Sequence, residues 1–284
     1  MGWLYLVIAI LGFSSLSLVC KLGQLRGSSS LGLVAMLMVT ASAMTAVLTF
    51  GEGLQWSWTT VILGAVGGVG GGVAFALYVV ALRTGHYAFS GAMLSASFLN
   101  AVLFSVIYWG EPMGLIRAAG ILMLVLAIGM IAASSTDQQD QAAKARWGRW
   151  ALLMLGAFIL NGIPQVCQAA LAKSGGQINL FLLSNFIIGS AMLAPMAASK
   201  GRMLGATIIF GTLAGLASVV GNVFNIMALT QLPPSVVLPT SMSGMMAAAI
   251  LLSRLVFKER ISPLGYAGLI CEVVGIVLLA GSGS

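Results

Sequence analysis

Ten apolar segments, each long enough to cross a lipid bilayer, account for most of this sequence. They cover residues 3–20, 31–50, 57–82, 88–109, 113–133, 150–172, 178–198, 203–229, 235–257 and 263–281. A helix needs roughly 17–25 residues to cross the hydrocarbon core. Among 284 residues, 60% are hydrophobic and 7% are charged, whereas soluble proteins are about a quarter charged. The sequence therefore predicts an all-α integral membrane protein with ten transmembrane helices.

An internal repeat organises these segments. The longest polar interruption, residues 134–149, separates two halves of similar length. Three pairs of positions match with a single inserted residue: Ala81-Leu82 with Ala228-Leu229, Glu111 with Glu259, and Gly120 with Gly268. Five spans per half is an odd number, so the two copies cross the membrane in opposite directions. We predict two inverted five-helix repeats, residues 1–133 and 150–284, joined by the linker 134–149.

The basic residues predict membrane orientation. The thirteen Lys and Arg residues are scattered between apolar blocks and form no basic face, which excludes nucleic acid as a partner. Eleven of them follow odd-numbered spans, and two, Arg117 and Lys173, follow even-numbered spans. The positive-inside rule then places the odd loops in the cytoplasm and both termini outside the inner (plasma) membrane.

Several features have purely structural interpretations. Cys20, Cys167 and Cys271 lie in or beside apolar segments without paired spacing, so we expect small apolar side chains. The glycine-rich stretch 64–72 lacks a phosphate-binding pattern, and its spacing predicts close helix packing. Four tryptophans stand before spans three and six and are expected to anchor at the membrane interface: Trp56, Trp58, Trp147 and Trp150. No catalytic set, metal site or cofactor motif is expected.

The repeat, the Ala-Leu pair late in spans three and eight, and the acid after spans four and nine resemble the drug/metabolite transporter superfamily, in its EamA-like branch. This resemblance implies a carrier that works by alternating access, with helices 1, 3, 4, 6, 8 and 9 around a central cavity and helices 5 and 10 at the periphery. It also implies small metabolites as substrates. Small four-helix relatives carry a glutamate in their first helix, where this chain has Gly12, Phe13, Ser14 and Ser17. Proton coupling through that position is therefore not expected.

Polar residues repeat at helical spacing in spans six and eight. In span six, Asn161, Gln165 and Gln168 are spaced i, i+4, i+7 beside Pro164; in span eight, the same spacing is shown by Ser218, Asn222 and Asn225. Polar groups in hydrocarbon need partners, so each face either lines a substrate cavity or packs against another helix. The repeat aligns Asn225 with Tyr78, and these neutral groups suit a neutral, zwitterionic or polyhydroxy ligand.

Spans four and nine are expected to be broken or softened at matching positions. Span nine has Pro239 followed by Ser241 and Ser243, and its counterpart in span four has Ser97 and Asn100. Interrupted helices at matching places of two repeats indicate a transport site. The alternative is a packing kink whose freed carbonyl groups are bonded by Ser and Thr.

Two titratable residues remain as candidates for proton coupling. His86 stands between spans three and four and is either a pH-sensitive gate or an interfacial residue. Glu272 lies near the centre of the last span, where an ionised side chain costs about 2.5–3.5 kcal/mol. It shares a helix face with Gly265, Gly268 and Gly275, which should turn it toward a neighbouring helix. It is either a hydrogen-bonded structural acid or a proton-coupling group.

The expected function is secondary transport of a small amphipathic or polar metabolite, in the direction of export. An uptake carrier for sugars or related metabolites is the nearest alternative. A non-transporting membrane helper and an intramembrane enzyme are alternatives of other classes. The expected partners are the lipid bilayer, a small-molecule substrate and a proton or other coupling ion, with the protein acting as a monomer or homodimer.

Overall fold

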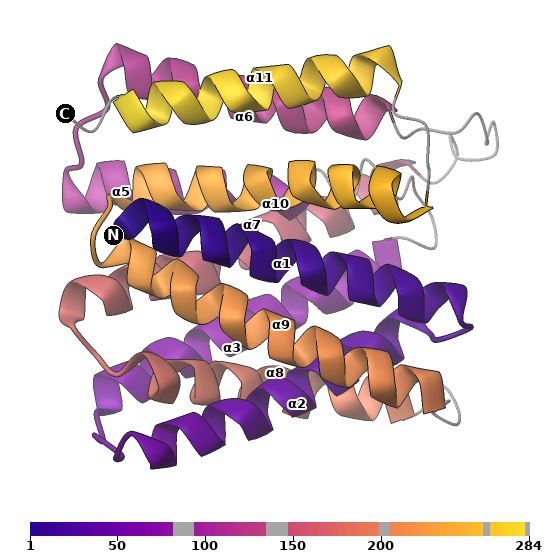
Figure 1. The fold of residues 1–284 in the computed structure, drawn as a ribbon. Coiled ribbons are helices and arrows are strands. Elements are labelled where there is room, and N and C mark those ends of the chain that lie inside the picture. The colour runs from indigo at the N-terminus through magenta and orange to yellow at the C-terminus, as the bar shows by residue number, and fades with distance from the viewer. Residues whose placement is uncertain (82–93, 135–146, 199–204, 258–261, 282–284) are drawn as a thin grey trace. The chain divides into compact units, whose positions relative to one another are not determined.

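The computed structural model describes residues 1–81, 94–134, 147–198, 205–257 and 262–281, and these residues form ten helices and no strand (Figure 1). The helices are α1 (Gly2–Leu25), α2 (Ser30–Gly51), α3 (Trp58–Ala81), α5 (Phe98–Trp109), α6 (Leu115–Ser134), α7 (Trp147–Ser174), α8 (Ile178–Ala198), α9 (Gly205–Leu229), α10 (Pro234–Phe257) and α11 (Pro263–Gly281). The all-helical prediction is confirmed for the described residues. His86 lies outside them.

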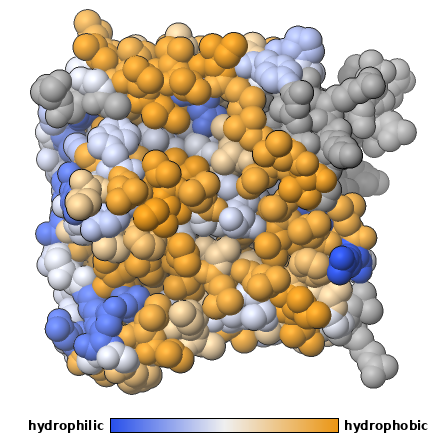
Figure 2. Space-filling view, viewed as in Figure 1, coloured by the Kyte–Doolittle hydropathy of each residue, from blue (hydrophilic) through white to orange (hydrophobic). Residues whose placement is uncertain are grey.

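Helix length and surface composition both indicate a membrane protein. Six of the described helices are long and apolar enough to cross a bilayer: α1, α2, α3, α7, α8 and α9. Large apolar side chains stand exposed on helices throughout the chain, as on Ile107, Leu152 and Ile209, and hydrophobic residues cover most of the face in Figure 2. Such a surface is stable in hydrocarbon and unfavourable in water.

The described chain packs as two compact units, and each unit contains residues from both halves of the sequence. The first unit comprises residues 1–73 and 163–232, and the second comprises residues 74–162 and 233–284. Helices α3 and α7 each contribute one end to each unit. Sequence repeats and packing units are different divisions of a chain, so their boundaries need not coincide.

Close glycine contacts hold the first unit together. Helices α1 and α9 run antiparallel, with Gly2 beside Gln231 and Leu232, and Gly12 beside Gly221. A methyl group on Gly12 would lie 2.8 Å from the backbone nitrogen of Gly221, so only glycine permits this approach. Small residues let backbones approach in the same way in other membrane helices.

The glycine-rich stretch of α3 packs against α8, which confirms the packing role predicted from its spacing. Gly64 lies against Ser184 and the carbonyl group of Phe181, and Gly68 lies against Asn185. Helix α9 presents Gly211 and Gly215 to α2. These glycines place α3 beside α8 and α9 beside α2, at backbone separations that larger residues would not allow.

We expect Gly68→Ala to destabilise the protein by about 1–3 kcal/mol, the usual effect of overpacking. The new methyl group would lie 2.5 Å from the carbonyl oxygen of Asn185, which is backbone and cannot rotate away. Gly129→Ala is the matched control, because no atom lies within 4 Å of its added methyl group. Thermal unfolding in bilayers should show a lower Tm for the first variant and an unchanged or higher Tm for the control; equal values would contradict the contact.

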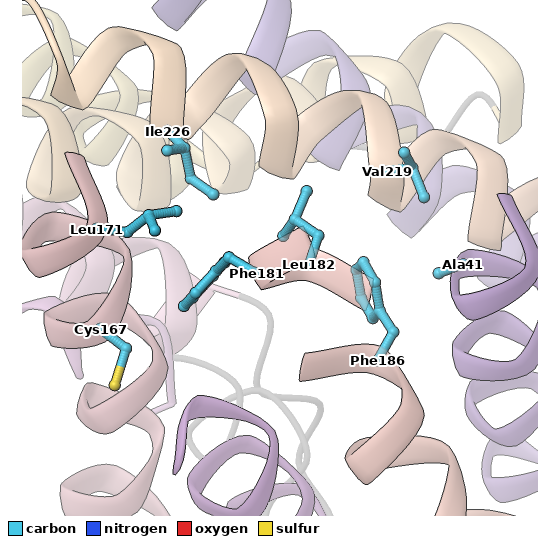
Figure 3. Close-up of a cluster of buried hydrophobic side chains, with 8 residues drawn as sticks. All are labelled: Ala41, Cys167, Leu171, Phe181, Leu182, Phe186, Val219 and Ile226. Atoms are coloured by element: carbon cyan, nitrogen blue, oxygen red, sulfur yellow. The ribbon is translucent and has the colours of Figure 1, made fainter. Parts of the chain in front are cut away.

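A hydrophobic core joins α2, α7, α8 and α9 in the first unit (Figure 3). Its buried members are Ala41, Cys167, Leu171, Phe181, Leu182, Phe186, Val219 and Ile226. The core confirms the prediction that Cys167 is a small apolar residue. Gln168 directly follows Cys167 on α7, and Asn225 directly precedes Ile226 on α9.

In the second unit, α6 packs along α11 and α5 packs against α10. Trp150, expected to anchor at the membrane interface, is instead only 4% exposed and packs with Ala81, Met154 and Ala157. That interpretation is wrong for Trp150, because the first turns of α7 lie against the end of α3 and enclose the indole ring.

Glu111 accepts a hydrogen bond from the backbone nitrogen of Ser235 at 3.4 Å. Ser235 lies in the first turn of α10, where the helix dipole stabilises a negatively charged carboxylate.

Candidate functional site

A chain of side-chain amides connects α7 and α9 in the first unit. Asn225 Nδ2 donates to Gln168 Oε1 at 2.9 Å, and Gln168 Nε2 donates to Asn222 Oδ1 at 3.0 Å. Asn222 Nδ2 then donates to the backbone oxygen of Ser218 at 2.8 Å and approaches its hydroxyl oxygen at 3.3 Å. The structure thus brings together four of the residues predicted to bind substrate, and we call these four residues the amide chain.

The amide chain is almost completely enclosed. Gln168 is 8% exposed, Ser218 is 5% exposed and Asn225 is 1% exposed, while Asn222 is half-buried. Asn225 Oδ1 has no hydrogen-bond partner among the described residues. Because buried polar groups are nearly always bonded, one buried amide oxygen without a donor marks a position where the protein surroundings alone do not satisfy the site.

Gln165 lies on α7 one turn before Gln168 and is buried. It belongs to the first unit, like the four residues of the amide chain. Asn161, one further turn back along α7, belongs to the second unit. The predicted polar residues of span six therefore lie on one continuous helix, but they belong to two different packing units.

A second polar cluster in the second unit surrounds an interruption of span four. The helix is broken by a turn at Ala96 and Ser97 before α5 begins. Asn161 Nδ2 donates to Ser97 Oγ at 2.7 Å and to the Leu94 oxygen at 3.3 Å, and Asn100 Nδ2 donates to the Phe158 oxygen at 2.8 Å. These bonds join the broken segment to α7.

Span nine is not broken at the matching place. Pro239 lies inside the continuous helix α10. Ser241 Oγ donates to the Leu238 oxygen and Ser243 Oγ to the Pro239 oxygen, and both side chains are fully buried. Span four is therefore broken, whereas span nine stays helical through Pro239. Its serine hydroxyls bond backbone carbonyl groups beside the proline, as in the alternative of a packing site satisfied by Ser and Thr.

Tyr78 and Glu272 both lie in the second unit. Tyr78 is half-buried beside the cluster around Trp150, with its ring centroid 5.8 Å from that of Phe75. Glu272 is 2% exposed, on the face of α11 that includes Gly275. Its burial in protein was predicted and is confirmed. Glu272 Oε2 has no hydrogen-bond partner among the described residues, so the partner expected for a structural acid is not seen at this atom.

Hydroxyl groups also connect helices of the first unit, and these contacts were not predicted from the sequence. Ser42 and Ser190 join α2 to α8 at 3.1 Å, and Thr40 donates to Thr212 across α2 and α9 at 3.5 Å. A single Ser or Thr in an apolar helix usually bonds its own backbone, as Thr45 does here. Residue type and spacing therefore carry no signal for these contacts.

Comparisons with known proteins identify a shared fold. No family model and no curated protein matches the chain. A solved crystal structure, described only as that of a protein, matches with a TM-score of 0.79 and covers 99% of this chain and 97% of that chain, at 17% sequence identity. At this identity the match shows similarity of fold alone.

Proposed function

We propose that this protein is a secondary transporter that exports a small polar or amphipathic metabolite by alternating access. The amide chain carries this proposal. Uncharged amides in a membrane helix are costly without partners and mark solute pathways when they gather at one place. Gln168, Asn222 and Asn225 gather in this way, and their neutral groups suit a neutral or zwitterionic solute better than a phosphate.

A plan of ten transmembrane helices in two inverted repeats is part of the proposal. Two sets of contacts in the first unit support it. The alignment that pairs Ala81 with Ala228 also pairs Gly64 with Gly211 and Gly68 with Gly215. Gly64 and Gly68 pack on α8, and Gly211 and Gly215 pack on α2, which are the seventh and second predicted spans.

The atoms that receive these glycines correspond as well. Gly64 meets the carbonyl oxygen of Phe181, and Gly211 meets that of Leu33. Gly68 meets the carbonyl oxygen of Asn185, and Gly215 meets that of Leu37. The separation in sequence between Leu33 and Phe181 equals that between Leu37 and Asn185. Duplication of one five-helix ancestor accounts for two such matching interfaces, whereas unrelated halves would have no reason to share them.

The energy source proposed is an ion or solute gradient, because the sequence contains no Walker motif. The resemblance to EamA-like carriers adds alternating access and the central role of spans six and eight. The orientation with both termini outside remains a prediction from loop charge. Uptake of sugars by the same site is the alternative that the neutral amides equally allow.

Flux measurements in liposomes test the proposal. Purified protein should give saturable flux of at least one compound from a panel of amino acids, sugars, nucleosides and organic cations, and an excess of that compound should compete. Protein-free liposomes supply the background. If the protein carries none of the four classes but releases products from lipid or peptide, it is an enzyme instead.

A further inference from the structure

The direction of every hydrogen bond in the amide chain follows from one backbone atom. The oxygen of Ser218 is a carbonyl and can only accept, so the Asn222 atom that faces it is the NH₂ group. The other end of that amide is then an oxygen, and it receives Gln168 Nε2. The Gln168 oxygen in turn receives Asn225 Nδ2. If any of these amide groups were rotated by 180°, two donors or two acceptors would face each other.

This order leaves a carbonyl oxygen at the Asn225 end of the chain. Asn225 Oδ1 is an acceptor because Nδ2 is committed to Gln168, and it has no donor among the described residues. Asn225 is 1% exposed, so bulk solvent does not provide that donor. A buried acceptor of fixed orientation is complementary to a hydrogen-bond donor.

The charge of the first unit restricts what the donor can be. Glu52 is the only acid among residues 1–73 and 163–232, and it is exposed at the end of α2. An unaccompanied cation beside Asn225 would therefore have no carboxylate in this unit to balance it, and burying an unpaired charge is costly. An anion would face a carbonyl oxygen, which repels it. An uncharged hydroxyl or N–H group meets neither obstacle.

We propose that Asn225 Oδ1 accepts a hydrogen bond from an uncharged hydroxyl or N–H group of the transported solute, and that this bond selects the solute. The inference rests on the proposed transport function and adds the chemical class of the substrate. Gln168 is the positioning residue, since its oxygen holds Asn225 Nδ2 and thereby presents Oδ1.

Matched pairs of solutes test this selection by flux. The probes are glucose, serine and uridine, each with its O-methyl ethers, and the proteins are full-length wild type, Asn225→Leu and Thr45→Val in liposomes. A site built around a hydrogen bond strongly rejects analogues that lack the donor. Wild type should carry at least one parent compound about tenfold or more faster than an ether, and Asn225→Leu should reduce this ratio to about twofold or less. Thr45→Val is the control, because that hydroxyl bonds only its own helix.

Infrared difference spectra separate this inference from the transport function. Protein with ¹³C-labelled asparagine side chains, compared with Asn225→Leu, isolates the Asn225 carbonyl band. The band should have the higher frequency of an unbonded carbonyl and should move lower when a transported parent compound is added. A band that is low from the start identifies a resident water, and a band that moves for no probe identifies an acceptor unused by solute; either outcome overturns the inference. Flux that persists with an unchanged band leaves transport standing while this assignment falls.

Discussion

Gln168→Leu is expected to reduce saturable solute flux by about tenfold or more, which corresponds to about 1.4 kcal/mol. Gln168 is the central member of the amide chain, because it accepts from Asn225 and donates to Asn222. Leucine removes both bonds and leaves Asn225 free to turn its oxygen away from the solute. Flux of a compound from the four-class panel, normalised to protein inserted in the liposomes, measures the effect.

The fold should survive this change. Hydrogen bonds between membrane helices contribute about 0.6 kcal/mol on average and up to about 1.7 kcal/mol, so two lost bonds cost about 1–3 kcal/mol. The core formed by Phe181, Phe186 and Ile226 does not depend on the amides. Thermal unfolding should therefore show a modest decrease in Tm with a cooperative transition retained.

Gln177→Leu is the matched control. Gln177 also makes two hydrogen bonds, from Gln55 N at 3.2 Å and to the Gly53 oxygen at 3.1 Å, but both are exposed at a connection between helices. The same substitution there should leave flux within about twofold, because exposed hydrogen bonds exchange readily with water. If both variants lose flux equally, the loss reflects general damage and the amide chain is not the transport site.

Helix positions were the most predictable part of this protein. Long apolar runs in lipid have one stable solution, because every backbone polar group must be bonded within the segment. The expected limits of spans seven and ten, 178–198 and 263–281, are the observed bounds of α8 and α11. The break at Ser97 was also predicted. The residue types at the matching positions did not determine which of the two helices would break, because α10 is continuous although it contains Pro239.

The candidate site was predictable as a set of residue types but not as a set of bonds. The i, i+4, i+7 spacing identified both polar faces, yet spacing along one helix does not specify which neighbour each side chain meets. Asn161 bonds the broken segment before α5, whereas Gln168 on the same face bonds α9. The prediction for Trp150 was wrong for a similar reason. A tryptophan near a helix end is expected at the membrane interface, and its enclosure depends on tertiary packing that the sequence pattern does not specify.

Glu272→Lys is expected to prevent accumulation of folded protein. Glu272 faces the interior of the second unit, on the side of α11 where Gly275 lies against Leu124 and the carbonyl oxygen of Gly120. Lysine at the centre of the proposed last span costs about 2.5–3.5 kcal/mol on insertion scales, and its side chain is longer than the glutamate that is buried at this position. Size-exclusion profiles and the yield of folded protein measure the result.

Glu272→Gln is the informative partner of that variant, because it keeps the shape and removes the ionisable group. We expect normal folding and flux within about twofold of wild type, with the response to an imposed pH gradient unchanged. Proton relays through membranes are chains of Asp, Glu or His, and neither α6 nor α10, the helices packed on α11, contains one. Their ionisable residues are Arg117, which donates to the Pro112 oxygen, and Arg254; α11 itself adds Tyr266 and Cys271.

The two variants together distinguish the two roles that the sequence left open for Glu272. A structural acid requires the size of the side chain but not its proton, so glutamine should substitute and lysine should not. A coupling acid requires the proton, so glutamine should abolish the flux that a pH gradient drives while exchange of solute for solute continues. Loss of gradient-driven flux alone in Glu272→Gln would thus assign proton coupling to α11, a helix that the family resemblance places at the periphery.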